Sequence, residues 1–163
     1  MSLRSLLYHT FWKKTYDKYE FKQLIQKGRI VDGRNGGLIL GSSHEQGGIF
    51  LYQFNEDHFI MDAEIEGNEY YVNRYAFDEQ ESRVRQINEY YPTALPKPQQ
   101  ISSQTEPMNI NADGFRKAIF VSAGMVVNAR ATQKYIAELD TMNRKYQKRW
   151  LTVDELFNPL RHL

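Results

Sequence analysis

Two stretches decide the fold: EGNEYYVNRYAFDEQESRVRQINEYY at residues 66–91 and VSAGMVVNARATQKYIAELDTMNRKY at residues 121–146. Aligned without gaps, they place Asn73 on Asn128 and share the Val-Asn step that contains these residues. In each, a short strand ends at the valine, and a helix follows whose apolar residues recur every three or four positions. A short asparagine side chain accepts from the free N–H groups of a first helical turn, so both asparagines are predicted N-caps.

Equivalent positions of the two predicted helices face the core. The first is expected over about 74–90 and the second over about 129–150, and Val84 and Ile87 of the first correspond to Leu139 and Met142 of the second. The two copies are not interchangeable, because Gln80 corresponds to Tyr135. The inner face expected for the first helix consists of Ala76, Gln80, Val84, Ile87 and Tyr91.

Strand signals precede both helices. Six of the ten glycines lie between residues 33 and 48, a density that predicts turns broken by one short strand at 38–40. GIFLYQF, HFIMDAEI and EYYVN then read as strands joined by the turns NED and EGN. MNIN, FRKAIFV and MVVN repeat this order before the second helix.

The fold class expected is therefore α+β, with two related β-hairpin–helix units and an N-terminal helix. The boundaries expected are 1–32 for the N-terminal helical segment, 33–91 for the first unit and 108–163 for the second unit with a C-terminal tail. Residues 2–27 read as helical in one or two pieces, ended by Gly28. Four of the five prolines fall in 92–107, which is expected to be a linker or an extended strap.

Composition excludes several classes of protein. A chain of 163 residues without cysteine has neither disulfides nor thiolate zinc sites, and it is long enough to bury an apolar core. The longest nearly apolar run, 118–127, is about half of what a bilayer requires, and the N-terminus lacks the apolar stretch of a signal peptide. No membrane span is expected.

The net charge of +1 hides a segregation of charge along the chain. Residues 1–34 carry a net of +5, residues 35–106 a net of −8, and residues 107–163 a net of +4. Such a chain either pairs its two signs within one molecule or presents a dipolar surface to another subunit.

The motifs of the chain bear on four kinds of chemistry: phosphate binding, metal binding, serine–histidine catalysis and contact with nucleic acid. The glycine-rich stretch lacks the spacing of a phosphate-binding loop, and His44, Asp57, His58 and Asp62 have no metal-ligand spacing. Ser43 and His44 are adjacent, so they point to opposite sides of an extended chain and are poorly placed to share a proton. The basic end RKYQKRW, residues 144–150, is more suitable for sequence-independent contact with nucleic acid through Lys145, Lys148 and Arg149.

Matching residues in both units carry a resemblance. The first unit fits the approximate pattern G-x-S-H-x-x-G-G, a hairpin, then E-G-G-E-[YF]-[VI]-[IV]-N-R, and a helix ending near an I-N pair. The second unit is similar to the variant G-E-[YF]-V-[IV]-N-A-[RK]-[AS]-T of the same pattern. This module resembles one found in bacteriophage and prophage structural proteins, particularly tape-measure-like and other virion proteins of phages infecting Bacteroidetes. Asn68 departs from the pattern by replacing a glycine, and Met125 by replacing an acid. The residues proposed to form the module are Gly41, Ser43, His44, Gly47, Gly48, Glu66, Gly67, Asn73 and Arg74, with Asn128 and Ala129 in the second copy.

The resemblance implies a non-enzymatic structural or assembly component of a phage particle, located in the virion and in the host cytoplasm during assembly. Its expected partners are other phage structural proteins in a homo- or hetero-oligomer, with no cofactor and no metal. Two alternatives stay open: a hydrolase that uses His44, and a small nucleic-acid-binding accessory protein that uses the basic termini.

Overall fold

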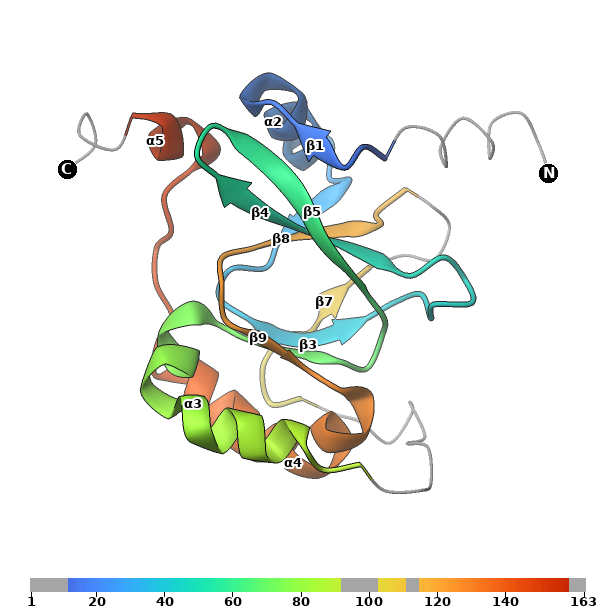
Figure 1. The fold of residues 1–163 in the computed structure, drawn as a ribbon, viewed down its shortest axis with the longest axis vertical. Coiled ribbons are helices and arrows are strands. Elements are labelled where there is room, and N and C mark those ends of the chain that lie inside the picture. Colours follow the sequence, from blue (N-terminus) through green and yellow to red (C-terminus); the bar gives the residue numbers. More distant parts are fainter. Residues whose placement is uncertain (1–11, 92–102, 111–114, 159–163) are drawn as a thin grey trace.

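The protein is an α+β fold of four layers. A computed structural model describes residues 12–91, 103–110 and 115–158. Two sheets face each other in the middle, α2 and α5 pack on the outer side of one sheet, and α3 and α4 cover the outer side of the other (Figure 1). The helices are α2 (Lys18–Gln26), α3 (Arg74–Asn88), α4 (Ala129–Arg144) and α5 (Val153–Phe157).

The sheets mix parallel and antiparallel strands. One has the order β1-β5-β4-β8-β2 and the other the order β7-β3-β6-β9. β8 runs parallel to both β4 and β2, and β7 runs parallel to β3, whereas the β4–β5 and β6–β9 pairs are antiparallel. The strands are β1 (Thr15–Tyr16), β2 (Ile30–Asp32), β3 (Gly37–Leu40), β4 (Ile49–Asn55), β5 (His58–Ile65), β6 (Tyr70–Val72), β7 (Met108–Asn109), β8 (Ala118–Val121) and β9 (Met125–Val127).

Alternation along the strands divides the apolar residues among three cores. In β8, Ile119 faces the other sheet while Phe120 faces α2 and α5. In β6, Tyr71 faces the other sheet while Tyr70 faces α3 and α4. Because successive side chains of a strand point to opposite faces, strands buried on both faces read as continuous apolar runs such as AIFV and YYV.

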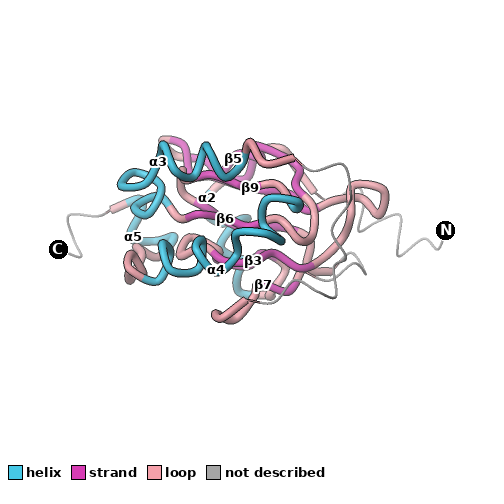
Figure 2. The backbone as a smooth tube through the Cα atoms, turned by 90° about the horizontal axis from the view of Figure 1, so that it is seen from below, coloured by secondary structure: helices cyan, strands magenta, loops and turns pink. Residues whose placement is uncertain are grey.

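The two strand–Asn–helix stretches lie together around an approximate two-fold axis. β6 and β9 pair antiparallel with Tyr71 opposite Val126, which are equivalent positions of the repeat. Arg83 of α3 forms an ion pair with its own equivalent, Glu138 of α4, at 2.7 Å. The two helices lie side by side across the four-stranded sheet (Figure 2). The correspondence seen in sequence is therefore also a correspondence in space over these segments.

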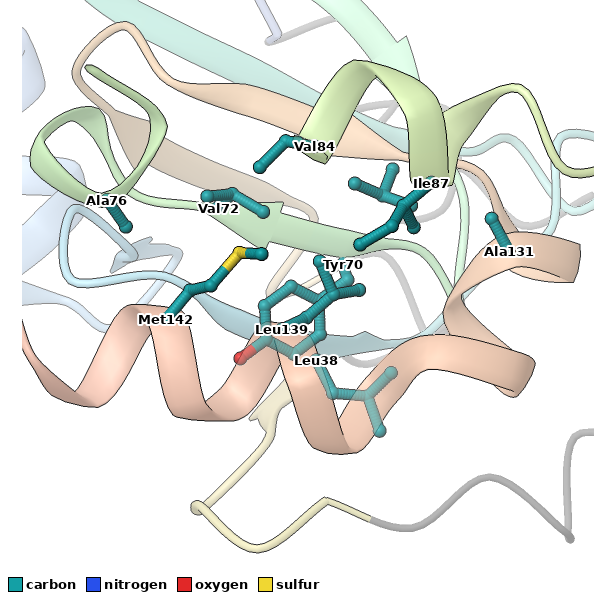
Figure 3. Close-up of a cluster of buried hydrophobic side chains, with 10 residues drawn as sticks. Leu38, Tyr70, Val72, Ala76, Val84, Ile87, Ala131, Leu139 and Met142 are labelled. Atoms are coloured by element: carbon teal, nitrogen blue, oxygen red, sulfur yellow. The ribbon is translucent and has the colours of Figure 1, made fainter. Parts of the chain in front are cut away.

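The shared core beneath these helices uses the predicted apolar positions. Val84 and Ile87 of α3 and Leu139 and Met142 of α4 converge on β6, where Tyr70 and Val72 lie (Figure 3). Ala76 and Ala131, one turn after the caps, are both fully buried.

Asparagines connect the two copies reciprocally. The side chains of Asn73 and Asn128 cap their own helices, accepting from the N–H groups of residues 76 and 131. The N–H of Asn73 donates to Oδ1 of Asn143, near the end of α4, and the N–H of Asn128 donates to Oδ1 of Asn88, at the end of α3. Each strand end is thus held by the C-terminal end of the other unit's helix.

The expectation of two hairpins is only half met. β4 and β5 form the predicted hairpin. In the described part of the second unit, consecutive strands do not pair: β7 joins β3, β8 lies between β4 and β2, and β9 joins β6. All four residues of β8 are buried, so this strand takes a central position with neighbours from elsewhere in the chain. The turns at 66–69 and 122–124 lead from one sheet to the other. Within the first turn, Asn68 (φ 72°) adopts the left-handed conformation expected of a residue that replaces a glycine.

Three helix predictions need correction. Thr15 and Tyr16 form a strand that pairs with β5, and the helix begins only after Asp17, because Asp17 caps α2 in a capping box with Glu20. Gln80 departs from helical geometry (φ −124°, ψ 27°) and is exposed, and Tyr91 lies beyond the end of α3 with 69% of its surface exposed.

The remaining expectations on helices and the strap are tested only in part. α4 ends at residue 144, earlier than expected, because the following segment bonds to the β2–β3 turn. Predictions for residues 1–11 and 92–102 lie outside the described residues. None of the described helices is long and apolar enough to cross a membrane.

Candidate functional site: a basic pocket

One asparagine positions the connection between α4 and α5. Asn35, in the β2–β3 turn, accepts from the backbone N–H of Lys148 at 2.9 Å and from the indole N–H of Trp150 at 2.8 Å. Its Nδ2 donates to the carbonyl of Lys148 at 3.0 Å. The connection therefore runs along one edge of the molecule, from α4 up to α5 (Figure 1).

A pocket of about 350 Å³ lies between this connection and the start of α3. Its volume is at the lower end of the range for small-molecule sites. The first two residues of α3 line it, together with residues from the β2–β3 turn, the end of β4, and β8. We call it the basic pocket, and its charged and ring-bearing wall consists of Arg34, Arg74, Lys148, Arg149, Phe54, Tyr75, Phe120 and Trp150.

Two of the four cations have no carboxylate partner among the described residues. The buried Arg34 is neutralised by Asp32, with Nη2 to Oδ2 at 2.8 Å and Nε to Oδ1 at 2.9 Å. Arg149 pairs with Glu155 at 2.9 Å. Across the described residues, neither Arg74 nor Lys148 forms an ion pair with a carboxylate, and both are exposed. The pocket therefore carries an uncompensated positive charge.

The unpaired cations rest on aromatic rings. The ammonium of Lys148 lies 3.8 Å from the ring centre of Tyr75, and the guanidinium of Arg74 lies 5.8 Å from the same ring. Tyr75 and Trp150 are neighbours, with ring centres 5.3 Å apart. Arg34 lies 5.6 Å from the ring centre of Trp150. Cations at such distances are attracted to a ring face, but they remain available to an anion, which binds them more strongly.

The pKa values of two groups near the pocket are shifted by hydrogen bonds, charges and burial. The pKa of Glu155 is lowered to about 2, because its carboxylate accepts the backbone N–H of Thr152 and pairs with Arg149. Burial raises the pKa of Tyr71, whose hydroxyl bonds to the 122–123 turn; the nearby Arg34 and Arg74 partly oppose the rise. The tyrosine is therefore neutral, and its hydroxyl holds the turn of Ser122, which lines the pocket.

Most residues of the phage-like module lie away from this pocket, where two loops touch. The N–H of Gly67 donates to the carbonyl of Ser42 at 3.1 Å, and a Cβ on Gly67 would lie 2.5 Å from the carbonyl oxygen of Gly41. The backbone N–H of His44 donates to Glu66 at 3.2 Å. Positive φ angles at Gly47 and Gly48 close the loop back onto β4. The glycines thus allow close backbone contact between the two loops.

The side chain of His44 is placed beside an acid instead of the adjacent serine. Its Nδ1 lies 3.8 Å from Glu64, and the side chain is about half exposed. The hydroxyl of Ser43 accepts from the backbone N–H of Gln46 at 3.2 Å, and so contributes to the turn. Burial raises the pKa of the neighbouring Glu69.

The histidine and aspartate residues that the sequence offers as metal ligands are also far apart. His58 begins β5 and pairs with Asp57 at 2.6 Å, whereas His44 lies near the other end of that strand. Over the described ranges, no group of three or more histidine, aspartate or glutamate side chains is arranged to hold a metal ion.

Several predicted residues do converge on the basic pocket. Arg74 from the module meets Lys148 and Arg149 from the basic end, although Lys145 does not line the pocket. Asn73, Asn128 and Ala129 start the helices. The sequence prediction missed Arg34, Tyr75 and Trp150. The segment YQKRW places two basic residues between two aromatic ones, which is a usable signal, but nothing in the sequence brings that segment next to Tyr75.

Comparisons with protein-family models, with curated proteins and with solved structures found no match to this chain. The fold and the basic pocket are therefore the basis for a functional proposal, beside the module resemblance.

Proposed function

We propose that this protein is a non-enzymatic assembly component of a bacteriophage particle and that its basic pocket holds an anionic group of another component. The phage setting, with virion location and phage structural proteins as partners, follows from the module resemblance. The mode of action follows from the pocket.

The observation that carries the docking role is a pair of cations at a concave site, Arg74 and Lys148, which have no carboxylate partner in the described part of the chain. A single exposed cation without a partner on an open surface is solvated by water, and it does not indicate a binding site. Here two of them border a cavity that has two more cations in its wall, and electrostatic complementarity of this kind favours recognition and fast association with an anionic partner.

The lining favours binding over catalysis. Among the described residues that line the pocket, Ser122 and Tyr75 carry hydroxyl groups, but none carries an imidazole or a carboxylate that would act as a general base for them. His44 belongs to the loop contact described above, outside this lining. The hydrolase alternative therefore receives less support than the docking role.

The test uses the phage that encodes the protein. Particles are purified on a density gradient and probed with an antibody, for the natural chain, for Arg74→Ala/Lys148→Ala, and for a control, Lys14→Ala/Lys27→Ala, which removes two exposed cations outside the pocket. We expect the natural chain and the control to sediment with particles or assembly intermediates, and the pocket variant to remain free. A natural chain that never sediments with particles would refute the proposal.

A further inference from the structure

We propose that the anionic group held by the basic pocket is the phosphate of a single-stranded nucleic acid, with one nucleotide seated in the pocket and its base against Tyr75 and Trp150. This inference rests on the proposed docking role of the pocket and names its ligand.

The phosphate would lie between Arg74 and Lys148. Both are exposed and lack carboxylate partners among the described residues, so neither has to break an ion pair to bind an anion. Arg34 and Arg149 are compensated by acids, so they raise the local potential less and contribute mainly to the wall.

The aromatic wall distinguishes a nucleotide from a simple anion. Tyr75 and Trp150 are half-buried neighbours beside the two cations, so one ligand can reach a ring and a cation together. Bases stack on aromatic side chains irrespective of sequence, whereas the carboxylates of an acidic peptide would use the cations alone. Lys148, now lying on the Tyr75 ring, is expected to move onto the phosphate and leave the ring face to the base.

The shape favours a single strand over a duplex. A cavity of about 350 Å³ has room for one nucleotide but not for a double helix, whose bases are stacked inside and whose phosphates lie on a convex surface. Arg144 and Lys145, which shortly precede Lys148 in the chain, are also exposed, and we expect them to give a strand further phosphate contacts that a free nucleotide lacks. The occupant is therefore a strand instead of an isolated nucleotide.

The experiment uses the full chain with Trp12→Phe, so that Trp150 is the one remaining indole. Four probes are titrated at several salt concentrations: a short oligothymidylate, an abasic strand of equal length, thymidine 5′-monophosphate, and an acidic polyglutamate peptide. Binding is followed by anisotropy of labelled probes or by competition, and base stacking by quenching of Trp150 fluorescence.

We expect the oligothymidylate to bind most tightly and to quench Trp150, and the abasic strand to bind more weakly without quenching. Arg74→Ala/Lys148→Ala should lower affinity at least about tenfold. Loss of two phosphate contacts should also reduce the slope of log K against log salt by about 1.4, at roughly 0.7 per contact for single strands. The Lys14→Ala/Lys27→Ala control, with the same change in net charge, should retain affinity and quenching. Circular dichroism confirms that each variant is folded.

The other outcomes separate the two proposals. Equal binding of the abasic strand, equal binding of the mononucleotide, or oligothymidylate binding that survives the pocket substitutions would each overturn the nucleic-acid inference. Polyglutamate binding that depends on Arg74 and Lys148, without oligothymidylate binding, would overturn it too while supporting the docking role for an acidic protein. Particle association that is lost in the pocket variant, with no probe bound, would likewise leave only the docking role.

Discussion

Replacing Asn143 by leucine tests the reciprocal connection between the two strand–helix units. Oδ1 of Asn143 accepts from the N–H of Asn73 at 2.9 Å, and its Nδ2 donates to the carbonyl of Tyr71 at 2.9 Å. Both backbone groups belong to residues that are no more than 1% exposed, and Asn143 itself is 2% exposed. Leucine is of similar size, so the substitution removes the hydrogen bonds with little loss of packing.

The magnitude follows from the N–H of Asn73, which loses its partner, whereas Tyr71 also pairs with Gly37 in the sheet. An unsatisfied buried donor costs roughly 1–3 kcal/mol, so Asn143→Leu should lower the free energy of unfolding by about 1–3 kcal/mol. That is a large share of the roughly 5–15 kcal/mol that stabilises a typical domain. The equivalent substitution, Asn88→Leu, leaves the N–H of Asn128 unpaired, but these two residues are only half-buried and water can reach them. Its cost should be about 1 kcal/mol.

Urea unfolding followed by circular dichroism measures both free energies, and the slope against denaturant shows whether the unfolding remains two-state. A loss below about 1 kcal/mol for Asn143→Leu, or equal losses for the two variants, would refute the argument that burial of these bonds holds the units together.

Three further predictions concern the loops and the surface. Gly67→Ala should cost more stability than Gly28→Ala in thermal unfolding, because a Cβ at residue 67 would meet the backbone of Gly41. At Gly28 (φ 74°) the space is open, and only the left-handed backbone, about 1 kcal/mol, opposes the change. Equal losses of stability in the two variants would contradict this. The pKa of Glu155 is lowered in the folded state, so its carboxylate stabilises the fold above the ordinary glutamate pKa, and this contribution disappears as pH falls from there to about 2. Glu155→Gln should therefore flatten that part of the curve of unfolding free energy against pH. An unchanged curve would contradict the lowered pKa. Asp140 is buried and accepts from the 103–105 segment, so Asp140→Asn should speed hydrogen exchange there, while unchanged exchange would show that other contacts anchor the segment.

The sequence by itself determined the local elements. The 3.6-residue periodicity and the Val-Asn step identified both strand–cap–helix segments, and Asn73 and Asn128 cap helices as expected. These features depend on neighbours within a few residues, so a single sequence contains them. Positions such as Gln80 were assigned to the wrong environment, since periodicity alone does not reveal a departure from helical geometry.

The tertiary structure alone decided which strands pair and where the basic pocket forms. The parallel pairing of β8 with β4 and β2 joins segments far apart in the chain, and a buried apolar strand such as AIFV carries no local signal for its neighbours. The pocket likewise depends on Asn35 holding the α4–α5 connection against the start of α3, so that Lys148 meets Tyr75. Residue types were visible in the sequence, but their convergence requires the long-range hydrogen bonds of the folded chain.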